Sequence, residues 1–367
     1  MCDVPALRFP EFNGEWITRP IKDIADFIGG GTPSSANEAY WQGTIPWVSS
    51  SDIVEDNIND ITISRYITEE AISNSATKLC SAPVILIVSR VGVGKVALSS
   101  KAICTSQDFC NLINIKVHPT FLAYSLSQIM KRKSIEVQGT SIKGITSLEI
   151  QKIILHIPSL QEQHKISDLF QLIDKRIAVQ SKIIEDLRLL SKGIIETVTS
   201  SQKPNTLIKD CLECNSSILQ ESQVAKYGAF SVYGATGITG YTEAADVNGE
   251  SILIIKDGSG VGTVKYVTGE YSYIGTLNRL IAKDGYCLKY IYFALQRFSF
   301  EPYKTGMAIP HIYFRDYGKA KIYCPSLSLQ TLIAQKLSLI ENKMEVEKRI
   351  ILCYQLQKSY LLSRMFI

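Results

Sequence analysis

The chain contains 367 residues, of which 46% are hydrophobic and 20% are charged, so it can bury the cores of two or three domains. This composition excludes a disordered protein, and the longest apolar runs, such as 83–88 and 252–255, are too short to span a membrane. The formal net charge of only +4 identifies no partner by itself.

Residues 1–5 lack the basic stretch and apolar core of a secretion signal. The nine cysteines are odd in number and scattered through apolar segments. We therefore expect a cytoplasmic protein whose thiols are reduced and buried.

Residues 1–157 form the first of four predicted segments. Short β-rich runs alternate with clusters of Gly, Pro, Ser and Asn, and one helix is predicted at 121–133. The β-rich runs are 45–49, 84–89, 95–98 and 112–117. This alternation is typical of a mixed α+β module.

Residues 158–200 form the second segment, in which apolar residues at 3-4 spacing predict one long helix with a coiled-coil seam. Residues 201–324 return to β-rich runs, at 251–256, 262–267 and 319–323, with a helix predicted at 288–298. Residues 325–367 repeat the seam. The residues expected to pair the two helices are Ile166, Phe170, Ile173, Ile177, Ile184, Leu187, Ile333, Leu337, Ile340, Met344, Ile351 and Tyr354.

An internal repeat relates the two halves. Residues 138–196 align without a gap onto residues 305–363 at a constant offset of 167. We therefore expect an α+β protein with two similar modules, separated by two long antiparallel coiled-coil helices about a pseudo-two-fold axis. The seams are interrupted at matching places, by Gln180 and Ser191 and by Glu347 and Lys358, and such polar residues can fix how two helices meet.

Charge is distributed unevenly within each module. Residues 1–89 carry 5 Lys/Arg against 12 Asp/Glu, whereas residues 90–157 carry 9 against 3. The second module repeats this change, from 3 against 6 in residues 201–255 to 10 against 5 in residues 256–324. Local clusters of cations attract a polyanion, so each module is predicted to have one basic face; the alternative is an ordinary solvated surface.

Several glycine-rich segments resemble nucleotide sites but lack the required context. Residues 92–95 and 258–262 each follow one predicted strand and precede another, which predicts hairpin turns, and residues 234–240 have the wrong spacing for a dinucleotide fingerprint. Cys211 and Cys214 have no second ligand pair nearby, and the four histidines do not cluster. The sequence therefore predicts no metal, no cofactor and no methyltransferase or nuclease motif, and hence a non-catalytic protein.

A contact surface is the remaining prediction. Lys and Arg neutralise phosphates, and Arg can bind guanine edges. The loops 138–143 and 305–310 connect a helix to the strand before each long helix, and they are either DNA-reading or purely structural. The predicted DNA-binding residues are Arg90, Lys95, Lys101, Lys131, Arg132, Lys133, Lys143, Lys256, Lys265, Arg279, Arg297, Lys304, His311 and Lys319.

Taken together, these segments resemble the specificity subunit of type I restriction-modification systems. The similar motifs, spread over the whole chain, are LRFPEF at 7–12, GEW at 14–16, GGTPS at 30–34, IPWV at 45–48, PSLQEQ at 158–163, YGATGI at 233–238, DG at 257–258 and GVG at 260–262. The second helix departs from the pattern, because residues 328–330 are Ser-Leu-Gln where residues 161–163 are Gln-Glu-Gln.

The resemblance implies two target recognition domains, 1–157 and 201–324, each reading one half of a split site in the major groove of double-stranded DNA. It implies that the helices 158–200 and 325–367 set the spacing between the half-sites. It also implies docking of two methyltransferase subunits, which carry the S-adenosylmethionine chemistry, and of ATP-dependent restriction subunits. Two alternatives stay open: a scaffold whose paired helices bind proteins without DNA, and a stand-alone methyltransferase or nuclease, which the missing motifs disfavour.

Overall fold

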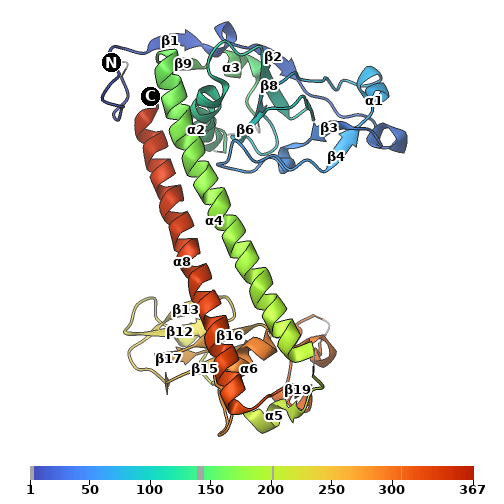
Figure 1. Cartoon of the computed structure of the whole chain (residues 1–367), viewed down its shortest axis with the longest axis vertical. Coiled ribbons are helices and arrows are strands. Elements are labelled where there is room, and N and C mark those ends of the chain that lie inside the picture. The colour runs from blue at the N-terminus through green and yellow to red at the C-terminus, as the bar shows by residue number, and fades with distance from the viewer. Residues whose placement is uncertain (1–3, 139–143, 201, 307) are drawn as a thin grey trace. The chain divides into compact units, whose positions relative to one another are not determined.

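The computed structural model describes residues 4–138, 144–200, 202–306 and 308–367. The chain divides into two compact units. The first unit comprises residues 1–180 together with residues 350–367, and the second comprises residues 181–349. Each unit contains one β-rich module and a part of both long helices (Figure 1).

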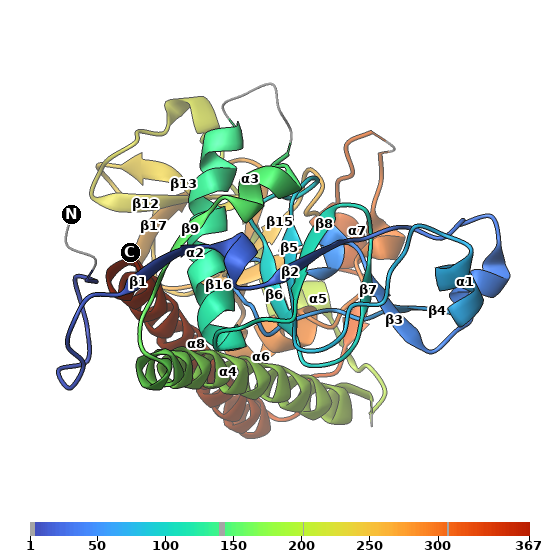
Figure 2. The ribbon, with the colours of Figure 1, turned by 90° about the horizontal axis from the view of Figure 1, so that it is seen from above.

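The first unit has three layers, namely a helix, a four-stranded sheet and a smaller sheet (Figure 2). The larger sheet is antiparallel, with the order β2 (Asp26–Gly29), β8 (Phe109–Ile113), β5 (Val84–Val88) and β6 (Val96–Ser99). The smaller sheet has the order β4 (Arg65–Ile67), β3 (Ile45–Val48) and β7 (Cys104–Thr105), and β3 and β7 are parallel.

Strand β5 explains why the larger sheet is covered on both faces. Its alternate residues Ile85 and Ile87 belong to the core beneath helix α2 (Pro119–Gln138), while Val84, Leu86 and Val88 belong to the core on the other face. All five residues are buried. A strand that is buried on both faces has a continuous apolar sequence instead of an alternating one, as the run VILIV has.

The second unit repeats this topology. Its larger antiparallel sheet has the order β11 (Leu212–Ser216), β18 (Leu277–Ala282), β15 (Ser251–Ile255) and β16 (Val264–Val267). Helix α6 (Leu288–Leu295) shares a core with one face of this sheet. The smaller sheet has the order β13 (Gly237–Thr242), β12 (Phe230–Gly234), β17 (Glu270–Tyr273) and β14 (Val247–Asn248), and β12 pairs with β17 in parallel, as β3 does with β7.

Short elements complete each unit. Antiparallel pairs join β1 (Ile17–Pro20) to β9 (Ile154–Ile157), and β10 (Thr206–Leu207) to β19 (Lys321–Ile322). The short α-helices are α1 (Glu69–Ser73), α3 (Ser147–Gln151), α5 (Ile208–Cys211) and α7 (Phe314–Tyr317). The 3-10 turns are η1 (Ile21–Asp23), η2 (Glu38–Trp41), η3 (Ser50–Asp52), η4 (Glu221–Gln223) and η5 (Glu301–Tyr303).

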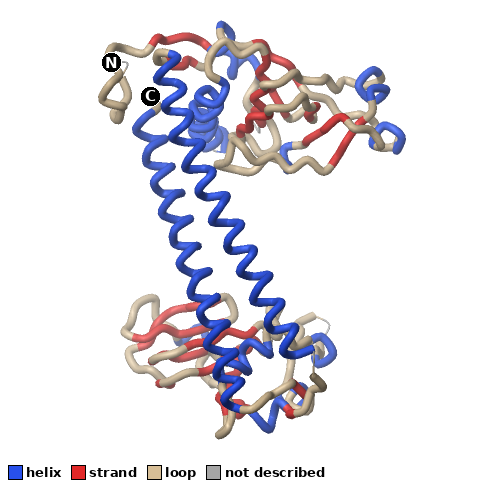
Figure 3. The backbone as a smooth tube through the Cα atoms, in the orientation of Figure 1, coloured by secondary structure: helices blue, strands red, loops and turns tan. Residues whose placement is uncertain are grey.

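Two long helices begin at positions that the sequence repeat relates, α4 (Leu160–Ser200) and α8 (Leu327–Met365), and Figure 3 shows each as continuous. Within the first unit they run antiparallel, because Phe170 packs against Phe366 while Asp174, further along α4, pairs with the earlier Lys358 of α8. Within the second unit, α4 residues 194, 195 and 198 share a core with Ile333 and Leu337. The twelve residues predicted to pair the helices are all buried or half-buried.

The sequence predictions of local structure differ from the structure mainly in register. The predicted strand 112–117 is observed as β8 at Phe109–Ile113, because pairing with β5 places Phe109 opposite Val88, and Ile115 and Val117 pack on the core from outside the strand. The predicted hairpin turns are confirmed: Gly92, Gly94, Gly258 and Gly262 all have positive φ.

Two further observations concern the described residues. No helix among them is long and apolar enough to cross a bilayer. Their cysteines are unpaired, and Cys80, Cys104, Cys110, Cys211 and Cys324 are buried.

Candidate nucleic-acid interface

The larger sheet of the first unit has an end formed by turns, which we call the loop end. There the hairpin 89–95 joins β5 to β6, residues 30–32 follow β2, and residues 106–108 precede β8. Ser89 N donates to Asp108 O at 2.8 Å, and Ile145 N donates to Ser89 O at 2.8 Å, which brings the chain before α3 against the hairpin.

The second unit has a loop end with matching hydrogen bonds. Lys256 N donates to Thr276 O at 3.0 Å, and Ile312 N donates to Lys256 O at 2.9 Å. The offset of the sequence repeat relates Ser89 to Lys256, and it also relates Ile145 to Ile312. The same offset therefore relates the first residue of each hairpin and the segment that packs on it.

Among the basic residues predicted in the first unit, the loop end collects Arg90 and Lys95. Arg90 is exposed, and Lys95 is half-buried with its Nζ donating to Ser50 O at 3.2 Å. Lys143 lies outside the described residues. Lys101 lies beyond the opposite end of β6. Lys131, Arg132 and Lys133 lie on α2 and not in the hairpin.

The loop end of the second unit contains Lys256, Lys304 and His311, because His311 forms β-bridges with Asp257 and with Thr305. Lys304 pairs with Glu301, Nζ to Oε1 at 2.5 Å. The other four predicted residues lie outside the loop end; three of them contact side chains of the chain itself, and the fourth is exposed to solvent. Lys265 lies over the Tyr233 ring at 4.7 Å, the Arg279 Nε donates to Ser251 Oγ at 2.7 Å, Arg297 pairs with Glu196, and Lys319 is exposed after α7.

The turn that holds Lys95 is itself braced. The Arg65 guanidinium stacks on Trp47 at 4.5 Å and pairs with Asp52, whose carboxylate also accepts from Ser49 N at 2.7 Å. Burial opposes ionisation of Asp52, but the bonds from Ser49 and Arg65 outweigh it and hold the pKa of this carboxyl below its usual value. The turn thus keeps a fixed acceptor, Ser50 O, for Lys95.

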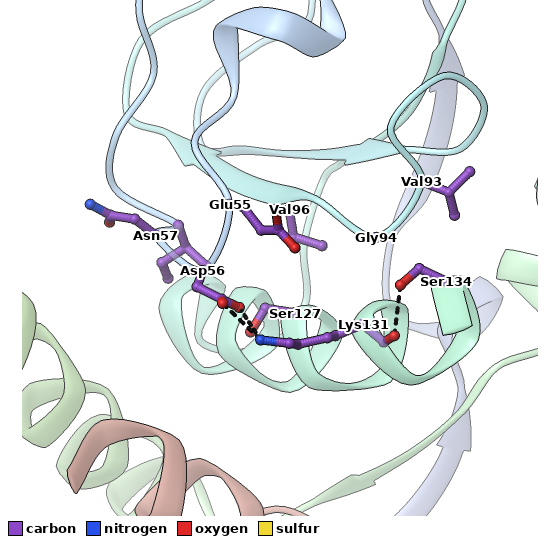
Figure 4. A pocket seen from close by; sticks show the side chains of 10 residues that line it. Glu55, Asp56, Asn57, Val93, Gly94, Val96, Ser127, Lys131 and Ser134 are labelled. Carbon is purple, nitrogen blue, oxygen red and sulfur yellow. Dashed lines mark hydrogen bonds and ion pairs between the residues drawn. The ribbon is translucent and has the colours of Figure 1, made fainter. Parts of the chain in front are cut away.

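A pocket lies at the base of the first hairpin, between residues 55–58, Val93–Val96 and α2 (Figure 4). Lys131 from α2 reaches across it to the Asp56 carboxylate, at 2.8 and 2.7 Å. Asp56 has φ of 58°, and its carbonyl oxygen accepts from Lys358 Nζ at 3.0 Å. Because the Asp56 carboxylate already pairs with the ammonium group of Lys131, this residue is less available to a phosphate than Arg90 is.

Two glutamines that the repeat relates fix the helix junctions of the two units in the same way. Gln163 Nε2 donates to Pro158 O at 2.9 Å, and its Oε1 accepts from His118 N, where α2 begins, at 2.8 Å. Gln330 donates to Pro325 O at 2.8 Å and accepts from Cys287 N, where α6 begins, at 2.9 Å. The contact is therefore retained in the second helix despite its different sequence.

The neighbouring position is where the two junctions differ. Glu162 is 0% exposed and binds Arg8 through two hydrogen bonds of 2.7 Å, which ties the N-terminal segment to α4. Its counterpart is Leu329, which is exposed.

Sequence reasoning missed the neutral and acidic members of the loop ends. Gln107 is exposed beside β8, and Asp257 occupies the turn after β15. Gly30 allows two backbone segments to approach closely, because a Cβ at this position would lie 2.0 Å from Ser106 O. A search for basic residues alone could not find these positions, although the glycine clusters around them were visible as turn signals.

Comparison with known proteins settles the family. The sequence matches the family described as type I restriction modification DNA specificity domain over residues 13–189 and again over 207–352. The chain belongs to this family of type I DNA specificity proteins. The two matches agree with the two modules of the fold.

Two named relatives of this type I family are partial matches. The specificity subunit of the type I restriction enzyme MjaIX from Methanocaldococcus jannaschii is 31% identical over 187 residues, which cover 48% of this chain and 42% of the relative. A type I restriction enzyme specificity subunit from Escherichia coli is 30% identical over 195 residues, covering 49% and 45%. The chain thus spans less than half of the length of each relative.

The fold is also that of a solved type I protein. The crystal structure of a type I restriction-modification system S subunit from M. genitalium is similar with a TM-score of 0.70 and 18% identity, over 99% of both chains. At this identity the likeness concerns the fold alone.

Proposed function

We propose that the chain is the DNA sequence-specificity subunit of a type I restriction-modification complex and reads a bipartite, asymmetric site. The observation that carries the proposal is the duplication of one module whose loop ends are built by the same hydrogen bonds. Membership in a DNA specificity family supports it. Each module would read one half-site.

The reading surface in this proposal is the loop end of each larger sheet. Turns present side chains to a groove without burying the backbone of the sheet, and cations among them neutralise phosphates while donors and acceptors read base edges. Arg90 and Lys95 supply this chemistry in the first module, and Lys256, Lys304 and His311 in the second. The remaining predicted basic residues keep only a phosphate-contact role.

We further propose that the chain has no catalytic chemistry of its own and acts through two methyltransferase subunits and the restriction subunits. The long helices offer docking surfaces for such partners. At three pairs of positions that the repeat relates, both members are apolar and at least 50% exposed. These pairs are Leu172 with Leu339, Val179 with Val346, and Leu189 with Leu356. A duplicated apolar surface suits two copies of one partner.

Mapping methylated adenines in the host genome, with the gene present and then deleted, tests this function. We expect one split motif to lose methylation on deletion. Persistence of every methylated motif would contradict the proposal.

The scaffold alternative is separated by salt dependence. DNA binding by the assembled complex should weaken steeply as salt rises, because phosphate contacts release counterions. A complex that binds no DNA at low salt would favour the scaffold.

A further inference from the structure

The two loop ends share the hydrogen bonds at the start of their hairpins but carry opposite charges at the next position. Arg90 directly follows Ser89, and Asp257 directly follows Lys256, so the matched hydrogen bonds place Arg90 and Asp257 at equivalent points where each hairpin begins, and the hairpin of the second unit is then one residue longer. The facing segment differs as well. Gly144 precedes Ile145 in the first unit, and His311 precedes Ile312 in the second.

Arg90 is poised to bind something outside the first unit. Its side chain is exposed and makes no hydrogen bond or ion pair with any residue that the structure describes. Gly144 faces it, and a Cβ at Gly144 would lie 3.0 Å from Ser89 O and 3.6 Å from Arg90 Cγ, so the close approach of the two backbone segments favours a glycine beside Arg90. The next residue, Val91, is 71% exposed and marks the hairpin tip as a projecting surface.

At the equivalent point of the second unit, a carboxylate replaces the guanidinium. Asp257 is half-buried and bridges to His311 in antiparallel pairing, and Gly258 N donates to Pro310 O at 2.9 Å. The His311 ring takes up space that Gly144 leaves open in the first unit, and Gly306, with φ of 89°, avoids a clash with it. A short acid opposite a bulky imidazole thus replaces a long base opposite a glycine.

We infer that Arg90 and Asp257 are specificity-determining residues and that their opposite chemistry makes the two half-sites different. The inference rests on the proposed function. A guanidinium only donates, and two of its N–H groups match the N7 and O6 acceptors of guanine. An ionised carboxylate only accepts, and it matches the N4 amino group of cytosine. Arg90 therefore reads guanine in one half-site, and Asp257 reads cytosine in the other.

The experiment uses the full chain assembled with its methyltransferase subunits and a library of randomised DNA duplexes, from which bound sequences are recovered and counted. Arg90→Ala is expected to lower the preference for guanine at one position by about 5- to 150-fold, with the other half-site unchanged. Arg90→Lys keeps the charge but not the paired donors, so it should bind nearly as well with reduced discrimination.

Asp257→Asn is the complementary variant. An amide both donates and accepts and suits the N6 and N7 edge of adenine, so the preference at one position of the other half-site should move from cytosine to adenine. Lys22→Ala is the matched control, because Lys22 is an exposed cation in η1. This turn precedes the N-terminal end of β2, which lies away from the loop end. Its motif should equal that of the wild type.

Three results would overturn the inference. They are an unchanged motif in Arg90→Ala, an equal loss of affinity for all sequences, which marks a phosphate contact, and loss of all binding by both Arg90 variants. Failure of the proposed function is distinguishable, because the wild-type complex would then select no motif at all.

Discussion

Lys358 shows at the scale of one residue how a polar interruption of an apolar seam is used. The residue is 7% exposed, and its ammonium group pairs with Asp174 Oδ1 at 2.5 Å. Asp174 Oδ2 accepts from Tyr124 OH at 2.7 Å and from Asn59 Nδ2 at 3.0 Å. One buried pair thus joins α4, α8, α2 and the loop before β4, so it fixes the pairing of the helices within the first unit.

Replacement of Lys358 by Met should destabilise the first unit by about 3 to 5 kcal/mol, because it leaves a buried carboxylate without its cation. All three tryptophans, Trp16, Trp41 and Trp47, lie in this unit, so the midpoint of urea unfolding followed by tryptophan fluorescence reports on it.

Two controls define this result. Lys175→Met removes an exposed cation of α4 and should change the midpoint little. Lys358→Met combined with Asp174→Asn removes both charges and should be less destabilising than Lys358→Met alone. An equal effect of Lys358→Met and Lys175→Met would show that the pair is dispensable.

His118 gives the first unit a pH dependence of known sign. Burial and the nearby His164 lower the pKa of His118, while Asp168 opposes them. The folded state therefore favours the neutral ring, whose Nδ1 lies 2.9 Å from Ser167 Oγ. The contribution of His118 to the free energy of unfolding should be fully present above the unfolded pKa of about 6.5. It should fall as the pH drops below that value, because the unfolded state then binds the proton more readily.

The fluorescence midpoint between pH 8 and pH 5 measures this loss. His118→Asn keeps an acceptor in place without a titrating group, so its profile should be flatter than that of the wild type. Parallel profiles would mean that other groups cause the pH dependence.

At the scale of elements, the glutamine clamps hold each long helix to the start of the helix that covers the sheet. Gln163 joins α4 to α2, and Gln330 joins α8 to α6. Each side chain bonds one backbone N–H that lies far from it in the sequence and one carbonyl of its own helix junction. The glutamine of each long helix therefore fixes the position of the first residues of the helix that covers the sheet.

Gln163→Ala should destabilise the first unit by about 1 to 3 kcal/mol, because His118 N and Pro158 O lose their partner in a buried junction. Gln161→Ala is the matched control, since Gln161 is exposed on the same turn of α4. The same urea measurement applies. Equal midpoints for the two variants would argue that water satisfies the freed groups.

At the scale of the whole molecule, the chain contains two copies of one module, which carry different side chains at equivalent turns. The units share sheet order, including the single parallel pair in each smaller sheet. The proposed function gives α4 and α8 a common role, in which their length sets the number of base pairs between the half-sites.

Deletion of residues 180–186 together with 347–353 tests that role. Each deletion removes one heptad, so the apolar seams keep their register while each helix shortens by about 10 Å. The spacer of the methylated motif should shorten by about three base pairs, at roughly 34 Å per ten base pairs, and both half-sites should stay the same. A motif with its original spacer would refute the role of the helices as a ruler.

Local physics explains what could be predicted before the structure was known. Heptad spacing located both long helices, and glycines between strands located both hairpins, because these signals depend on residues a few positions apart. The surroundings of the predicted basic residues, in contrast, depend on contacts between distant parts of the chain. Arg297 and Arg279 matched the basic pattern but bond to Glu196 and Ser251, which lie 101 and 28 residues away.

The sequence by itself determined the family, the duplication and the order of modules and helices, since these are written in motifs and in a constant offset. The tertiary structure alone decided which cations gather at a loop end, and it revealed that Arg90 and Asp257 are equivalent. The physical reason is that sheet pairing, buried ion pairs and hydrogen bonds join residues far apart in the chain, and no local pattern encodes such contacts. The hydrogen bond from Lys358 Nζ to the Asp56 carbonyl oxygen, for example, spans 302 positions.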